Sequence, residues 1–148
     1  MEQLYCPIRK GWVAALPEER VRQRILSHMI DEKGFPASLI VVEKAIKQLP
    51  HLATEGIHSI PDRRVDVACF AKVSEGLYPL LAIECKAVPL TSKVIHQVTG
   101  YNHYIRASFI AIVNEIELKT GGYDSVKNAY VFVDFLPSYQ ELLREFRH

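Results

Sequence analysis

Two ionisable residues stand at the end of the apolar run YPLLAIECK, residues 78–86. A run of this kind is typical of a buried strand. Because successive side chains of a strand point to opposite faces, Glu84 and Lys86 share one face and Cys85 points to the other. We therefore expect a carboxylate and an ammonium to project side by side where this strand ends.

A second carboxylate belongs to the preceding predicted strand, residues 64–71. If the two strands form an antiparallel hairpin centred near Glu75, facing residues have numbers that sum to about 150, so Asp66 stands opposite Glu84. Carboxylates at that spacing, with β-carbons roughly 4.5–5.5 Å apart, repel by about 3–4 kcal/mol at an effective dielectric constant near 20. A divalent cation or a shared proton would remove this repulsion.

Oxygen ligands of this kind select hard ions such as Mg²⁺ or Mn²⁺. Mg²⁺ tends to take one or two protein carboxylates and to fill its other positions with water and substrate phosphate, which favours phosphate chemistry. Lys86 would then orient or deprotonate the attacking water. Glu18, predicted to project inward from the first helix, is a further candidate ligand. Gln97 and Tyr101 lie at i and i+4 on a later helix, so both can reach the same cleft.

The elements that must position these residues follow from periodicity and end signals. A first helix is predicted from Pro17 to about Asp31, with Glu18 in line with the apolar residues Ile25 and Met29. A second helix, capped by Thr91 or Ser92, is predicted to run to about Ala107. Strands are predicted at residues 38–42, 64–71, 77–87, 108–113 and 129–133, with a turn at Gly121-Gly122 and a closing helix from Ser138.

The predicted order is therefore α-β-β-β-α-β-β-α, an α/β fold with a mixed central sheet flanked by helices. The helix between the strands at 77–87 and 108–113 makes these two strands parallel. With 148 residues, the chain has the length of one domain, and we expect a single domain over residues 1–148.

Composition narrows the class of protein. No apolar run approaches the roughly 18 residues of a membrane span, so no membrane association is expected. The three cysteines are far apart and form no CxxC pair, which argues against a disulfide framework and a zinc site and favours a reducing cytoplasm. A net charge of +1 neither supports nor excludes a nucleic-acid partner. No phosphate-loop motif is present, so a nucleotide-driven motor would have to be on another chain.

The residues named above resemble a known pattern. Asp66, Glu84-Cys-Lys86 and Gln97-Val-Thr-Gly-Tyr101 resemble the PD-(D/E)xK nuclease superfamily, including the QxxxY motif of its RecB-like members. From about Pro17 to Leu143 the chain looks more specifically like the N-terminal endonuclease domain of type I restriction-enzyme R subunits. This likeness is carried by residues 17–23, 63–66, 81–87, 97–104, 109–114 and 134–139.

The resemblance implies a restriction-endonuclease-like core and a Mg²⁺-dependent endonuclease that hydrolyses DNA phosphodiester bonds. In such a site Asp66, Glu84 and the backbone carbonyl of Cys85 would bind the metal, and Lys86 would serve the water. Glu18 would match the acidic residue of the first helix.

Gln97 and Tyr101 would form the accessory motif near substrate and metal. DNA, and the motor and specificity subunits of a restriction system, would be the partners.

The chain departs from the pattern in that its literal Pro-Asp pair is Pro61-Asp62, whereas Val65 precedes Asp66. The predicted register selects Asp66.

Other interpretations of the same residues remain open. Glu84 and Lys86 alone would also make an ordinary ion pair, and Asp31-Glu-Lys33 and Glu117-Leu-Lys119 match the same tripeptide. A thiol nucleophile at Cys85 with His96 or His103 as base is disfavoured, because a buried cysteine usually packs as a small apolar residue.

Two further functions compete with the endonuclease. One is a non-catalytic nuclease fold that binds DNA or assembles with partner subunits. The other is a metal-dependent phosphohydrolase that acts on nucleotides.

Overall fold

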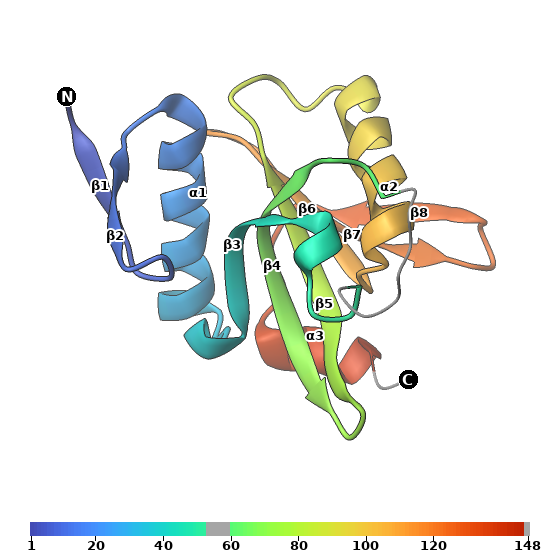
Figure 1. Cartoon of the computed structure of the whole chain (residues 1–148). Helices are drawn as coiled ribbons and strands as arrows, with labels where there is room; N and C mark the ends of the chain where they lie inside the picture. Colours follow the sequence, from blue (N-terminus) through green and yellow to red (C-terminus); the bar gives the residue numbers. More distant parts are fainter. Residues whose placement is uncertain (53–59, 147–148) are drawn as a thin grey trace.

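The structure is a computed structural model that describes residues 1–52 and 60–146. Its centre is a six-stranded mixed sheet with the order β3-β4-β5-β6-β7-β8 (Figure 1). The strands are β3 (Ile40–Ala45), β4 (Arg64–Val73), β5 (Gly76–Cys85), β6 (Phe109–Val113), β7 (Leu118–Asp124) and β8 (Ala129–Val133). The other main elements are the hairpin strands β1 (Gln3–Cys6) and β2 (Gly11–Ala14) and the helices α1 (Pro17–Ser27), α2 (Ser92–Ile105) and α3 (Tyr139–Phe146). The predicted fold class is confirmed.

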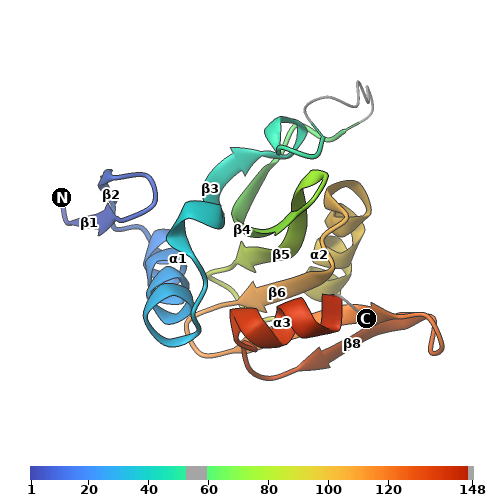
Figure 2. The ribbon, with the colours of Figure 1, turned by 90° about the horizontal axis from the view of Figure 1, so that it is seen from below.

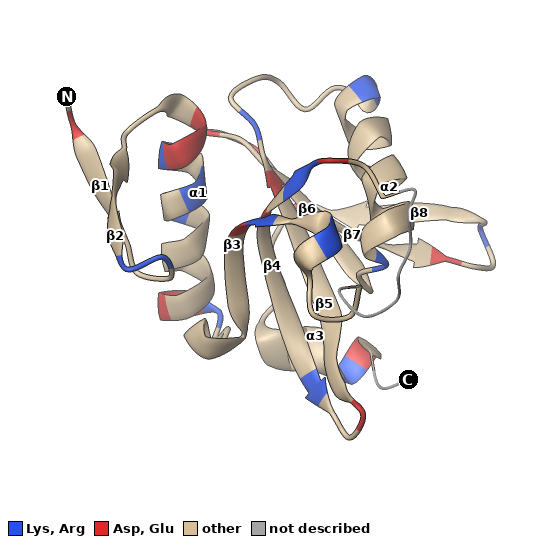
Figure 3. Ribbon diagram, in the orientation of Figure 1, with Lys and Arg blue, Asp and Glu red and all other residues tan. Residues whose placement is uncertain are grey.

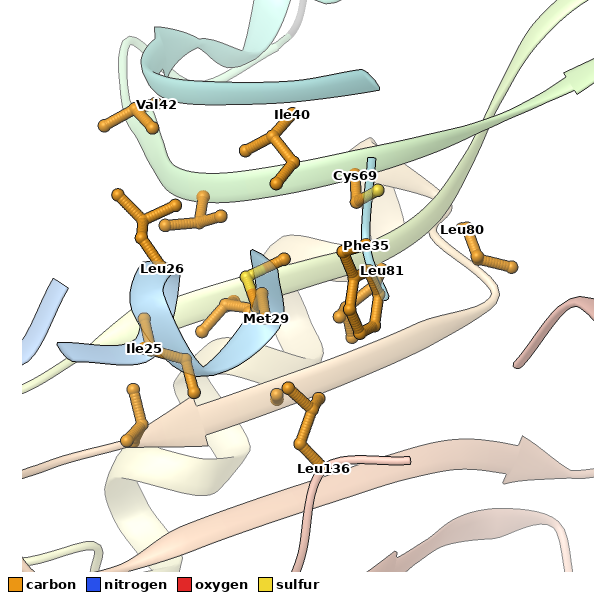
Figure 4. Packing of buried hydrophobic residues seen from close by; sticks show 14 of the residues in the cluster. Ile25, Leu26, Met29, Phe35, Ile40, Val42, Cys69, Leu80, Leu81 and Leu136 are labelled. Atoms are coloured by element: carbon orange, nitrogen blue, oxygen red, sulfur yellow. The ribbon is translucent and has the colours of Figure 1, made fainter. Parts of the chain in front are cut away.

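Helices cover both faces of the sheet. Residues of α1 and α3 share one apolar cluster with the sheet, while α2 packs against the opposite face (Figure 2). Figure 4 shows the first cluster, in which Ile25, Leu26 and Met29 lie next to Phe35 and Leu81. The alternation of β5 explains the two clusters, because Leu81, Ile83 and Cys85 face α1 while Ala82 faces the other layer.

The hairpin of β4 and β5 has the predicted register over its central part. Val67 pairs with Ile83, Ala68 with Ala82 and Cys69 with Leu81, and a bulge then shifts the register by one residue. The turn at Ser74-Glu75 is also where it is predicted. On the other side of β5, β6 pairs in parallel, as expected for strands joined by a helix.

Local end signals place the helices that carry site residues. Thr91 caps α2, because its hydroxyl oxygen accepts a hydrogen bond from the backbone N–H of Val94 at 3.3 Å. Pro17 opens α1, whose chain continues through a π-helical turn at His28–Glu32, so the predicted helix to Asp31 is confirmed in extent. Arg106 ends α2 in a left-handed conformation with φ 61°.

Two parts of the fold differ from the predictions. The hairpin β1–β2 precedes α1, where no element is predicted. The predicted turn at Gly121-Gly122 is wrong, because both glycines lie inside β7, between β6 and the edge strand β8. A side chain at Gly121 would meet Phe132, its partner on β8, so this glycine serves close strand packing.

Among the described helices, none is long and apolar enough to cross a membrane.

We predict that Gly121→Ala lowers the free energy of unfolding by about 1–3 kcal/mol, measured by urea denaturation. A methyl group there would lie 2.6 Å from the Phe132 ring and 2.8 Å from the carbonyl oxygen of Val131. Gly100→Ala in α2 is the matched control, since nothing lies within 4 Å of its added methyl group. The control should be neutral or stabilising by up to about 1 kcal/mol. Equal effects of the two substitutions would contradict this interpretation of Gly121.

Candidate functional site

The central hairpin opens at the end where β4 begins and β5 ends. The pairing of β4 with β5 stops at Val67 and Ile83. Beyond that point the first residues of β4 remain paired with β3, and Glu84 and Cys85 remain paired with β6. Asp66 and Glu84 are therefore the next residues on two strands that part from each other.

Asp66 spans this opening with its side chain. Its Oδ2 accepts a hydrogen bond from the backbone N–H of Cys85 at 2.8 Å. Its Oδ1 accepts one from Nη2 of Arg22 on α1 at 2.7 Å. The Asp66 side chain is 14% exposed, so the carboxylate is held from two sides in a mostly buried position.

Glu84 is equally buried and has a different set of partners. Its Oε1 accepts a hydrogen bond from Arg63 Nη2 at 2.8 Å and lies 3.5 Å from Lys86 Nζ. Burial and the negative charge of Asp66 raise the pKa of Glu84 to about 7, although the charges of Arg63 and Lys86 act in the opposite direction. The two carboxylates thus interact unfavourably in the folded protein, as the predicted register requires.

A network of ion pairs supports the α1 side of the site. Arg22 is buried, and its guanidinium contacts Glu19 on the same helix and Glu43 on β3 as well as Asp66. Arg9, between β1 and β2, binds the same two glutamates at 2.6 and 3.4 Å. Acidic and basic segments of α1, β3 and β4 accordingly lie near one another in Figure 3. Burial tends to raise the pKa of Glu19, but hydrogen bonds and the arginine charges lower it.

Glu18 lies on the stripe of α1 that carries Ile25 and Met29, but it is in the first turn and is exposed. The prediction that it projects inward is therefore wrong, and the neighbouring Glu19 is the buried acid. The charge of Glu18 is among the causes that raise the pKa of the buried Cys85 thiol, after burial and the charges of Asp66 and Glu84. Its role as a metal ligand stays a prediction.

The residues from α2 are only partly brought to the site. Tyr101 is half-buried, and it lines a small cavity of about 20 Å³ together with Glu84. The guanidinium carbon of Arg63 lies 3.9 Å from the centre of the Tyr101 ring. Gln97 is exposed one turn earlier and is not part of the cavity wall.

Comparison with protein families finds one match, which covers most of the chain. Residues 17–137 match the family described as type I restriction enzyme R protein N terminus. The chain belongs to this family. No curated protein and no solved structure matches the chain at a significant level. The matched range includes Asp66, Glu84, Lys86 and both residues of the α2 motif, and it begins after the β1–β2 hairpin that carries Arg9.

Membership of this restriction-enzyme family raises the question of a metal. Within residues 1–52 and 60–146, no group of three or more His, Cys, Asp or Glu side chains is arranged to hold a metal ion. The donors that the sequence predicts are the carboxylates of Asp66 and Glu84 and the backbone carbonyl of Cys85. These are hard oxygen donors, and a carboxylate has further lone pairs beyond those that Arg22 and Arg63 use. The donor set therefore fits Mg²⁺ or Mn²⁺ in type, with water or phosphate filling the remaining positions.

The main residues that sequence reasoning missed are the partners of the two carboxylates. In the sequence Arg22 and Arg63 stand within short basic clusters, residues 20–24 and 63–64, and this pattern does not show that they pair with buried acids. The i, i+3 spacing of Glu19 and Arg22 is a signal of a helical ion pair, but it does not show that the pair is buried. Glu43, with φ 50°, has no sequence signal that places it here.

We predict that Glu84→Gln stabilises the metal-free protein at pH 8, by about 1–3 kcal/mol. The pKa of Glu84 is raised from 4.5 to about 7 in the folded state, so folding is penalised once this group ionises. The free energy of unfolding of the wild type should therefore fall relative to that of the variant as pH rises from about 5 to 8. Urea denaturation in EDTA at several pH values measures the difference.

The difference should shrink towards pH 5, where Glu84 is protonated in the folded wild type. A variant that is less stable than the wild type at pH 8, or a difference that does not change with pH, would contradict the unfavourable interaction of Glu84 with Asp66.

Proposed function

We propose that this chain is the metal-dependent nuclease domain of a restriction system and that it hydrolyses phosphodiester bonds of DNA. The observation that carries the proposal is the pair of mostly buried carboxylates, Asp66 and Glu84, where β4 and β5 part, with Lys86 next to them. A structural ion pair needs one acid, whereas two acids that repel each other favour a divalent cation. Family membership supports the same conclusion.

The residues would have distinct roles in this reaction. Asp66, Glu84 and the Cys85 carbonyl would hold Mg²⁺ or Mn²⁺, and Glu18 would add a ligand from the first turn of α1. The metal, when bound, supplies charge stabilisation for the phosphate and the leaving oxygen. Lys86 Nζ, 3.5 Å from Glu84 Oε1, would hold the attacking water by a hydrogen bond beside the carboxylates.

The exposed amide of Gln97 would contact the substrate, and Tyr101 would complete the accessory motif behind Glu84. DNA would be the substrate, and motor and specificity subunits would deliver it, because the chain itself contains no phosphate-loop motif. We propose a cytoplasmic location, which suits the three free and buried cysteines.

A second candidate function is a nuclease fold that binds DNA or assembles with other subunits without turnover. The observation that favours it is the charge balance of the site. Among the residues that the structure describes, the ion pairs of the site join four acids (Glu19, Glu43, Asp66, Glu84) and four bases (Arg9, Arg22, Arg63, Lys86). The formal charges cancel, so the network is neutral before any metal binds.

We predict that the purified chain nicks or linearises supercoiled plasmid in Mg²⁺ or Mn²⁺ and that Lys86→Ala lowers the rate by about 10²–10⁴-fold. Asp66→Asn should lower it at least as much, because the cation would lose a ligand and face a neutral side chain. Gel electrophoresis of time courses at saturating metal measures the rates.

Lys33→Ala is the matched control, because Asp31-Glu-Lys33 has the same tripeptide pattern and lies on the far end of the α1 segment. It should cleave at the wild-type rate. Cleavage that survives both Lys86→Ala and Asp66→Asn would exclude this site as the source of activity. Plasmid that stays intact in both metals would exclude autonomous cleavage and favour the second candidate.

A further inference from the structure

Arg63 connects two residues of the site that belong to different elements. Its guanidinium carbon lies 3.9 Å from the centre of the Tyr101 ring on α2, and its Nη2 donates a hydrogen bond to Glu84 Oε1 on β5 at 2.8 Å. A planar guanidinium can stack on an aromatic face and donate from its edge at the same time. Arg63 is therefore a bridge between α2 and the end of β5.

The backbone of Arg63 is fixed on both sides just before β4. Its N–H donates to the carbonyl oxygen of Pro61 at 2.9 Å, and its own carbonyl oxygen accepts from the N–H of Ile46 at 2.9 Å. The side chain is 35% exposed, while that of Glu84 is 13% exposed. A fixed backbone and a stacked guanidinium together define where the positive charge stands relative to Glu84.

We propose that Arg63 is a positioning residue that serves as the counter-ion of Glu84, and that Tyr101 acts on the site through its ring face by holding Arg63 there. The proposal rests on the proposed function, because it concerns the same carboxylate pair. It assigns a role to Arg63 and changes the role of Tyr101, which then needs no contact with substrate.

The aromatic ring of Tyr101, and not its hydroxyl group, makes the contact with Arg63. The attraction between a cation and an aromatic ring depends on the ring face, which phenylalanine also provides. Within the part of the chain that the structure describes, the contact of Tyr101 with a charged group is made by this face. The phenolic hydroxyl is therefore dispensable for holding Arg63, whereas the ring is not.

A counter-ion affects metal binding and turnover in opposite directions. Arg63 and a divalent cation both require the negative charge of Glu84, and like charges next to one carboxylate repel each other. Removing Arg63 should therefore strengthen metal binding. The same removal frees the Glu84 side chain from its fixed position, which should slow a reaction that depends on exact placement of the ligand. A residue needed only for stability would weaken both.

The test compares Arg63→Ala, Tyr101→Phe, Tyr101→Leu and the double variant Arg63→Ala/Tyr101→Leu with the wild type. Binding of Mn²⁺ alone, without DNA, is measured from the free-ion signal in electron paramagnetic resonance. Plasmid cleavage at saturating Mn²⁺ is measured in parallel. Tyr104→Leu is the matched control, since Tyr104 is another half-buried tyrosine of α2 that packs against apolar residues.

Arg63→Ala should lower the dissociation constant for Mn²⁺ by about threefold or more and lower the cleavage rate by about tenfold or more. Tyr101→Leu should move both quantities in the same directions by smaller factors, and Tyr101→Phe, which keeps the ring face, should bind Mn²⁺ with the dissociation constant of the wild type. The double variant should equal Arg63→Ala, because Tyr101 acts through Arg63. Tyr104→Leu should change neither quantity.

Weaker or unchanged Mn²⁺ binding in Arg63→Ala would overturn the proposal. A Tyr101→Phe variant whose dissociation constant for Mn²⁺ equals that of Tyr101→Leu would also overturn it. The proposal would likewise be wrong if the change in Mn²⁺ binding free energy in the double variant equalled the sum of the changes in Arg63→Ala and Tyr101→Leu. If no variant, the wild type included, cleaves DNA, the proposed function fails, while the pattern of Mn²⁺ binding alone still decides the role of Arg63. A wild type that binds no Mn²⁺ would overturn both.

Discussion

The structure depends on one unfavourable interaction, the burial of two carboxylates next to each other where β4 and β5 part. Removing water from a carboxylate already opposes its ionisation, and a second negative charge adds to the cost. Both effects raise the pKa of Glu84 to about 7. A fold that only needed a stable sheet end would gain by replacing one acid, and this cost is the reason for proposing a cation site here.

Each carboxylate is stabilised by an arginine from a different layer. Arg22 comes from α1, is buried, and is itself enclosed by Glu19 and Glu43, so Asp66 is held rigidly. Arg63 is more exposed than Arg22, and its stacking on an aromatic ring of α2 places its charge beside Glu84. Arg9 links the β1–β2 hairpin to this network through Glu19, and the hairpin lies outside the range that matches the restriction-enzyme family. The N-terminal residues therefore contribute to the site from outside the matched domain.

Much of the fold could be predicted from the sequence because it depends on local patterns. The register of the central hairpin follows from strand alternation and one turn, and its extension by one residue beyond Val67 and Ile83 brings Asp66 and Glu84 together in space. The cap at Thr91 and the buried stripe of α1 are equally local. The turn predicted at Gly121-Gly122 is wrong because glycine marks turns more often than close strand packing. Only the position of Phe132 beside Gly121 distinguishes a turn from a strand here. The arginine network could not be predicted, since Arg9, Arg22, Glu43 and Arg63 meet through contacts between elements that are far apart in the chain.

The central claim is that Asp66 and Glu84 together bind one divalent cation. A crystal structure of the protein grown with Mn²⁺, with the ion located by its anomalous scattering, tests this claim most directly. We predict a peak between the two carboxylates, with oxygen distances of about 2.1 Å, and a further ligand from the Cys85 carbonyl. A Mn²⁺ ion bound elsewhere, with Arg22 and Arg63 still paired to Asp66 and Glu84 and no peak between these carboxylates, would contradict it.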